Sequence, residues 1–148
     1  MQLHLEGSNS VKAPKEKVFS LLTNPEFIAR TLPDAEDVHI IDGSSLEAKL
    51  KLRIAVVSST MKMNLTIIRT SPPSKATLVA EGTGSGSNLK ITSVFDLSGD
   101  APTIMSWTAD AEISGLMAGI GSSLLKGFAT KKVAEIFSGI TKAVESAS

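Results

Sequence analysis

The sequence predicts an α+β fold in which a curved antiparallel β-sheet of about six or seven strands wraps around one long C-terminal helix. Two observations predict it. Between residues 38 and 113, apolar and polar residues mostly alternate, which is the period of a half-buried strand. In Leu116–Ala147, apolar residues instead recur every three or four positions, as one helical face requires. Consecutive strands pair antiparallel, and only this helix is long enough to cover their apolar face.

Composition narrows the class of protein. A chain of 148 residues, 42% of them apolar, can bury a core, and we expect residues 1–148 to form a single domain. The chain has no cysteine, which excludes disulfides and thiolate metal sites. Its 15 basic and 15 acidic residues are mixed along the sequence, so we expect no nucleic-acid binding.

The N-terminus and the apolar runs bear on localisation. Met1–Ser10 has neither the basic start nor the apolar run of a signal peptide. No run approaches the roughly 18 apolar residues that span a bilayer. We therefore expect a cytoplasmic protein whose membrane contact is at most peripheral, at the inner face of the membrane.

The first third of the chain predicts one strand and two short helices. Residues alternate in Leu3–Val11, as in a strand. Pro14 then begins a helix, because the fixed φ of proline suits the first helical position. Asn24 is a good N-cap for a second helix that starts at Pro25 and ends at Leu32-Pro33-Asp34.

About six consecutive strands are expected next, joined by turns. The clearest runs from Leu46 to Val56 after a turn at Asp42-Gly43-Ser44. Its partner, Met61–Ile67, precedes Ser71-Pro72-Pro73-Ser74, where two prolines stop the ladder. The other expected strands contain Val38 and Ile40, Leu78 to Gly82, Leu89 to Leu97, and Met105 to Ile113.

The long helix must lie on a surface, because each large side chain that it buries contributes roughly 1.5–3 kcal/mol. Glycines at 115, 119 and 121 interrupt its start, which is typical of close packing on strands or of a hinge for a lid. We assign Gly115, Gly119 and Gly121 as a candidate hinge. The opposite side carries Lys126, Lys131, Lys132 and Lys142, either as a solvated face or as a basic face for an anionic membrane.

No catalytic or metal-binding set is recognisable. Gly82–Gly86 lacks the Gly-Lys-Ser/Thr ending of a phosphate loop and precedes a strand. His4 and His39 are expected on the surface beside charged residues. Asp110 and Glu112 share one strand face and could serve acid–base chemistry only if that face pointed inward, whereas we expect it to point outward. We therefore expect no catalytic residues, no metal and no cofactor.

The interior is expected to be aliphatic and adaptable. Aromatic residues make up only 4% of the chain, and five methionines are present. Trp107 is expected to face the concave side of the sheet with Met105, either filling the core or lining a cavity. The candidate ligand-cavity wall consists of Leu52, Met63, Leu65, Leu78, Phe95, Met105, Trp107, Leu124 and Phe128.

A series of short motifs runs along nearly the whole chain. They are Ala13-Pro14 with Lys17-Val18-Phe19, Asn24-Pro25-Glu26, Leu32-Pro33-Asp34-Ala35-Glu36, Glu81-Gly82-Thr83-Gly84, Trp107-Thr108-Ala109-Asp110 and Gly115-Leu116-Met117-Ala118. Their order and spacing resemble the CoxG family, named for a carbon monoxide dehydrogenase gene product, in the START/Bet v 1-like (SRPBCC) superfamily. The resemblance implies a helix-grip fold. Asp34 stands where the family usually has glycine, and the chain ends at Ser148, where membrane-anchoring members typically carry a C-terminal extension.

The resemblance also implies a function. It implies a non-enzymatic domain with an apolar cavity for a lipid or a quinone-like molecule, in support of an aerobic CO dehydrogenase or a related molybdenum hydroxylase. One alternative is an assembly or membrane-recruitment factor that needs no ligand. A second is a small cyclase or hydratase on the same fold, which would need an inward-facing acid or base. A homodimer stays open.

Overall fold

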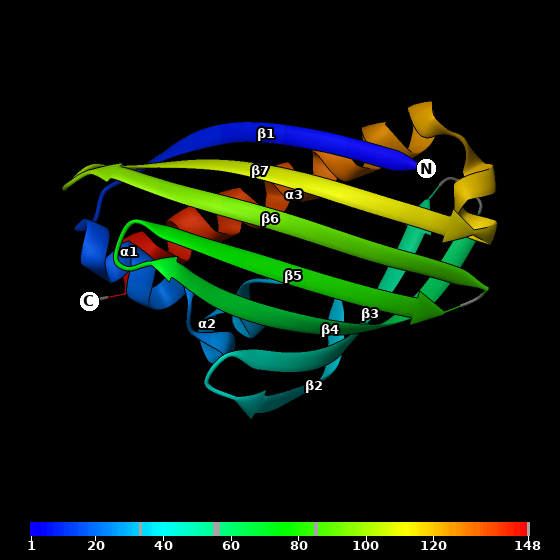
Figure 1. Ribbon diagram of the computed structural model, residues 1–148, viewed down its shortest axis with the longest axis horizontal. Coiled ribbons are helices and arrows are strands. Elements are labelled where there is room, and N and C mark those ends of the chain that lie inside the picture. Colours follow the sequence, from blue (N-terminus) through cyan, green and yellow to red (C-terminus); the bar gives the residue numbers. More distant parts are fainter. Residues whose placement is uncertain (33, 55–56, 85, 148) are drawn as a thin grey trace.

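The computed structural model describes the chain except for Pro33, Ala55, Val56, Ser85 and Ser148. Its strands form one antiparallel seven-stranded sheet in the order β1-β7-β6-β5-β4-β3-β2. The sheet curves around α3, which lies behind it in Figure 1. The predicted fold class is confirmed.

The elements follow one another along the chain in the predicted order, with two short helices between the first strand and the rest of the sheet. They are β1 (Gln2–Val11), α1 (Lys15–Leu22), α2 (Pro25–Thr31), β2 (Ala35–Asp42), β3 (Ser45–Ile54), β4 (Val57–Ser71), β5 (Lys75–Gly84), β6 (Ser87–Gly99), β7 (Thr103–Gly115), the 3₁₀ helix η1 (Leu116–Ile120) and α3 (Ser122–Ser146). The end of the predicted strand Leu46–Val56 lies outside the described residues beyond Ile54.

The long C-terminal helix is divided, where the sequence predicts one continuous helix from Leu116 to Ala147. A 3₁₀ turn, η1, comes first, and α3 begins only at Ser122. Gly121 stands between them with a φ of 104°, a conformation that side-chain-bearing residues rarely adopt. This backbone conformation ends η1 and sets the direction in which α3 starts.

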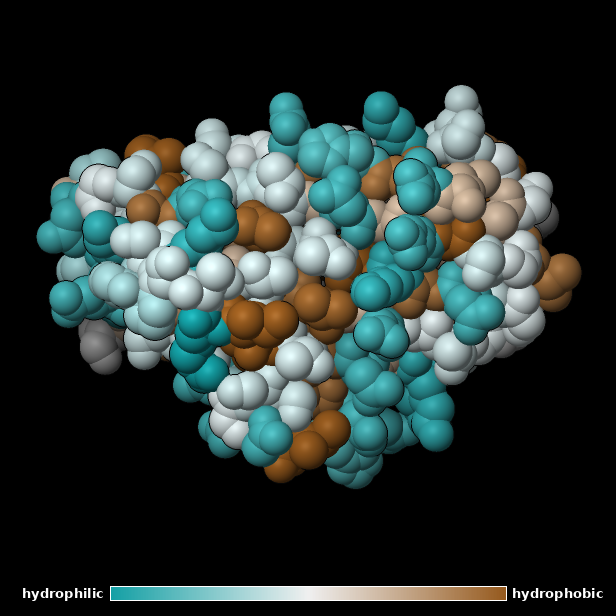
Figure 2. All heavy atoms as spheres, in the orientation of Figure 1, coloured by the Kyte–Doolittle hydropathy of each residue, from teal (hydrophilic) through white to brown (hydrophobic). Residues whose placement is uncertain are grey.

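Strand register places the apolar positions on the concave face of the sheet. Leu65 of β4 pairs with Ala80 of β5, Ala80 with Ile91 of β6, and Ile91 with Ala111 of β7. Side chains alternate between faces, so the intervening polar residues point outward. Figure 2 shows the outer face as mostly hydrophilic and neutral, with scattered apolar patches.

The concave face packs against α3 in two clusters. In the first, the ring of Phe137 on α3 stacks on Trp107 with centroids 4.4 Å apart and lies 5.5 Å from Phe95. This cluster also takes up the buried faces of α1 and α2. The second cluster is built on methionines, Met61 and Met63 among them, and lies toward η1. The aromatic cluster therefore fills one end of the interior, and more flexible side chains line the other.

Candidate functional site

Two connected cavities lie at the methionine-rich end, between the β3–β4 strands, η1 and the first turns of α3. Figure 1 shows the ends of β3 and β4 rising beside η1. The outer cavity has a volume of about 690 Å³, and the inner cavity has a volume of about 180 Å³. Both are lined by Leu52, Ser58 and Ser59, so the two volumes adjoin. The outer volume alone falls within the range of small-molecule sites, roughly 300–1,000 Å³.

The inner cavity is mainly apolar. Besides the shared residues, it is lined by side chains of η1 and of the end of β3, with one serine from the start of β6. These are Ile54, Ser87, Leu116, Met117 and Ile120. Several apolar side chains of the second cluster stay only partly buried around this space, namely Leu50, Leu52, Leu89, Ile120 and Phe128. The apolar surface under η1 is therefore incompletely covered by the protein itself.

Two buried serines of the inner cavity differ in their hydrogen bonding. The Ser87 hydroxyl oxygen accepts a hydrogen bond of 2.8 Å from the backbone N–H of Met117 and so holds η1 on the sheet. Ser59 is 9% exposed, and its hydroxyl has no hydrogen-bond partner among the described residues. Leaving a buried hydroxyl unpaired costs about 1–3 kcal/mol. Ser59 therefore offers a hydrogen-bonding group that the rest of the described chain does not use.

Charged side chains surround the outer cavity. Lys51, Arg53 and Lys132 line it, against one carboxylate, Asp34. Lys132 Nζ lies 2.7 Å from Asp34 Oδ2, and this hydrogen bond raises the pKa of the ammonium above its ordinary value of 10.5. Lys132 therefore stays charged, and the lining carries more positive than negative groups.

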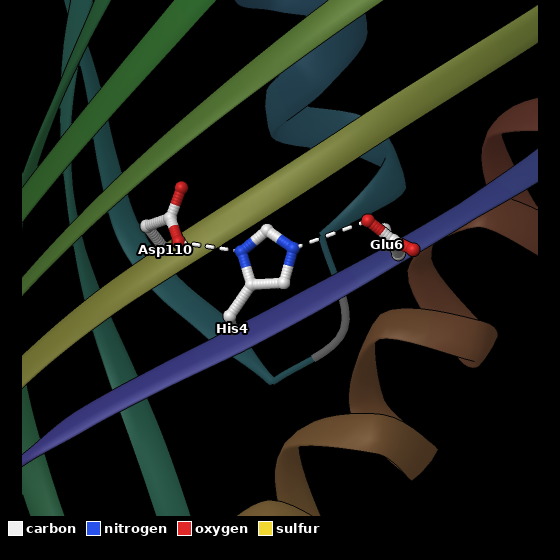
Figure 3. Close-up of polar contacts among 3 residues, drawn as sticks. All are labelled: His4, Glu6 and Asp110. Carbon is white, nitrogen blue, oxygen red and sulfur yellow. Dashed lines mark hydrogen bonds and ion pairs between the residues drawn. The ribbon is translucent and has the colours of Figure 1, made fainter.

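A second polar cluster lies on the outer face of the sheet, away from the cavities (Figure 3). His4 Nδ1 lies 2.6 Å from Asp110 Oδ1, and His4 Nε2 lies 3.2 Å from Glu6 Oε2. The bond to Asp110 is the main cause that raises the pKa of His4 above 6.5, with Glu6 second. Asp110 and Glu112 are exposed, as predicted. Both ring nitrogens are already paired with carboxylates, and within the described part of the chain no group of acidic or histidine side chains is arranged to hold a metal.

Comparison with known proteins assigns the family. The family model of CoxG, described as a carbon monoxide dehydrogenase component, matches residues 7–145. The chain belongs to the CoxG family. Among curated proteins, none matches the chain.

Solved structures agree with this assignment. A conserved protein from Geobacillus kaustophilus is 26% identical, with a TM-score of 0.85 over 96% of this chain and 95% of its own. A START superfamily protein from Mycobacterium smegmatis is 15% identical, with a TM-score of 0.74 over 98% and 99% of the two chains. The Zhui aromatase/cyclase from Streptomyces sp. R1128 is 14% identical, with a TM-score of 0.67 over 98% and 94%. The last two show the START-like fold alone.

The conformation of Asp34 accounts for the glycine that CoxG proteins usually have at this position. Its φ is 63°, in the left-handed region that glycine adopts freely and aspartate tolerates better than most residues. In exchange for that strain, the carboxylate reaches Lys132 across the outer cavity. The family position therefore lies at the mouth of the site.

The predicted cavity wall is divided between core and cavity. Leu52 and Phe128 line the outer cavity. Met63, Leu78, Phe95 and Met105 are buried, and Leu65 and Trp107 pack partly buried against the first cluster. Beyond the two cavity residues, the predicted positions contribute to the core clusters around the site.

Leu124 lies elsewhere. It is 55% exposed, whereas its neighbour Leu125 is 2% exposed and belongs to the second cluster. The predicted stripe counted Leu124 and Phe128 on one face of an unbroken helix. Because α3 restarts after Gly121, its first inward-facing residue is Leu125 instead.

The candidate hinge glycines have different surroundings. A Cβ at Gly115 would collide with the backbone of Gly86 and lie 2.9 Å from the Cα of Ser87, which is the close-packing interpretation. Gly119 and Gly121 have nothing within 4 Å of a Cβ position. Hinge motion stays a prediction, and open space around it is found at the two later glycines.

Sequence reasoning missed Ser59 and the charged mouth. Ser59 has the same strand parity as Met61 and Met63, so the alternation places its hydroxyl on the concave face. A polar residue at an inward position was the available signal. The pairing of Asp34 with Lys132 joins residues 98 positions apart and left no local signal.

Proposed function

We propose that this CoxG-family chain binds a hydrophobic small molecule, lipid-like or quinone-like, in the two connected cavities. The observation that supports this most directly is the apolar inner cavity of about 180 Å³ under η1, open to an outer cavity of about 690 Å³. Apolar surface that the protein leaves uncovered there would be removed from water by a guest, at roughly 25 cal/mol per Å².

The proposed mechanism is shielding. A guest enters through the outer cavity and is covered by η1 and the first turns of α3. The segment from Gly115 to Gly121 would move to admit it, because backbone freedom is concentrated there. The guest would be carried in an apolar environment and released unchanged.

A non-enzymatic role is part of the proposal. Among the described residues of the inner cavity, the only polar side chains are serine hydroxyls. The ionisable groups are at the outer cavity, where Asp34 and Lys132 pair with each other. General acid–base chemistry needs a group with a free proton position beside the guest, and this lining supplies little of that kind.

The proposed partner enzyme is of the CO dehydrogenase type, a molybdenum hydroxylase, in line with the name of the family. A ligand-independent assembly or recruitment factor is the second candidate, and the aromatic cluster that fills one end of the interior favours it. Cytoplasmic localisation with peripheral membrane contact also belongs to the proposal. None of the helices that the structure describes is long and apolar enough to cross a membrane.

Ligand extraction and titration test the proposal. Organic extracts of purified protein are examined by mass spectrometry, and calorimetry follows titration with a short-chain quinone and with decanol. We expect a co-purified lipophile and saturable binding. Leu52→Trp should abolish binding by filling the cavities, whereas Leu124→Trp, which adds the same ring at an exposed position, should leave binding unchanged. If neither probe binds saturably and no lipophile is extracted, the assembly-factor hypothesis is favoured.

A further inference from the structure

We propose that the site selects a single-chain amphiphile with a carboxylate head, whose head occupies the outer cavity and whose chain enters the inner cavity. The inference rests on the proposed function and names the chemical class of its ligand. Three features of the connected cavities carry it: the hydroxyl of Ser59, the excess of cationic side chains at the mouth, and the change from polar to apolar lining along the site.

The Ser59 hydroxyl is the first feature. Ser59 lines both cavities, it is nine-tenths buried, and its hydroxyl has no partner among the described residues. Ser87, buried nearby in the inner cavity, is fully engaged in holding Met117. An O–H donor at the junction of the two cavities suits a guest that places an acceptor oxygen there. A hydrocarbon without such an oxygen would leave the donor unpaired.

The cations of the outer cavity are the second feature. Lys51 lies 3.2 Å from Glu36, and Lys132 is paired with Asp34. For Arg53, no ion pair is found within the described part of the chain, although it lines the same cavity. A guanidinium presents two parallel N–H donors that match a carboxylate. A carboxylate guest would complete a charge set in which three cations face one acid.

The order of polarity is the third feature. The outer cavity carries every charged residue of the site, and the inner cavity carries none. Its volume of about 180 Å³ equals roughly six water volumes at ~30 Å³ each, which suits a short length of hydrocarbon chain. The head and the chain of one amphiphile would therefore meet linings of matching polarity.

Calorimetric titration with decanoate and with decanol, both below their micellar concentrations, tests the inference. The two probes share a chain and differ in the charge of the head. We expect decanoate to bind at least tenfold more tightly than decanol at low salt. Raising NaCl to 0.5 M should weaken decanoate binding and leave decanol binding nearly unchanged, because ions screen only the charged head.

Variants assign the preference to residues. Arg53→Gln should weaken decanoate binding about tenfold and leave decanol binding within twofold, whereas Lys142→Gln, the same charge change far along α3, should alter neither. Ser59→Ala should weaken decanoate binding severalfold. Thr141→Val removes the other unpartnered buried hydroxyl, which lies nine positions beyond Lys132 on α3, and should have no effect on binding.

Each outcome decides something. Circular dichroism shows whether a variant folds, and the salt dependence of the unaltered protein serves as a test that needs no variant. Equal affinity for the two probes, with no salt dependence, overturns carboxylate selection and leaves hydrophobic binding standing. Absence of binding for both probes overturns the proposed function itself. Decanoate preference that survives Arg53→Gln and Ser59→Ala unchanged overturns the assigned head position.

Discussion

Single side chains decide the chemistry of this CoxG-family site. The Ser59 hydroxyl is inward because β4 alternates, and it is unpartnered because the neighbouring β3 position, opposite it in the register, is Leu52. Asp34 holds a backbone conformation that favours glycine, and its carboxylate bridges to Lys132. On the other face of the sheet, His4 is held between Asp110 and Glu6 by register and alternation alone. The first two residues belong to the cavity, and the His4 cluster provides a pH-dependent surface contact.

Replacing Asp110 with asparagine should lower the pKa of His4, because the carboxylate of Asp110 is the main cause that raises it. A raised folded-state pKa means that the contact stabilises the protein fully below about 6.5 and that this contribution is lost as pH rises through the folded-state value. NMR titration of the His4 ring measures the shift, and thermal unfolding at pH 5.5 and pH 9 measures the stability. We expect Asp110→Asn to destabilise the protein at the lower pH only.

Glu112→Gln is the matched control for that substitution. Glu112 lies on the same exposed face of β7, and among the described contacts of His4 the carboxylates are Asp110 and Glu6. An equal shift of the His4 pKa in both variants would show that general surface charge, and not the 2.6 Å contact, controls this histidine.

At the scale of elements, the sequence predicted the succession of strands and helices from period alone, and the structure confirms it. The helix break at Gly121 was not predicted, because an apolar stripe of helical period continues across it and cannot report a φ of 104°. That break moves the inward position from Leu124 to Leu125. Periodicity therefore predicted the type of element, and backbone conformation at one glycine decided which residues reach the site.

Gly121→Ala should destabilise the protein by about 1–2 kcal/mol, because an L-residue is strained at this φ even though nothing lies within 4 Å of the Cβ position. Gly127→Ala is the matched control. Gly127 lies inside α3 with nothing within 4 Å, and alanine there should stabilise the helix by about 0.5–1 kcal/mol. Urea unfolding measures both. Equal and favourable effects at the two sites would mean that η1 and α3 form one continuous helix in solution.

On the scale of the whole molecule, the interior is filled at one end and hollow at the other. The Phe95–Trp107–Phe137 cluster and the short helices occupy the first end. Under η1, partly buried side chains surround the two cavities. The sequence predicted an aliphatic interior between sheet and helix, but the position of the hollow depends on where α3 starts and where β3 and β4 bend. Those are properties of the assembled fold, so no local pattern carried them.

Two leucines on one strand test this division of the interior. Leu46 and Leu52 lie on the same face of β3; Leu46 is 1% exposed in the first cluster, and Leu52 is partly buried at the junction of the cavities. Leu46→Ala should cost about 2–5 kcal/mol, since it leaves a void in packed core. Leu52→Ala should cost less than about half of that, because its side chain already borders open space, and it should weaken decanol binding where Leu46→Ala does not. Urea unfolding and calorimetry give the two readouts. Equal losses of stability, with binding unaffected by either change, would contradict a hollow at this end of the sheet.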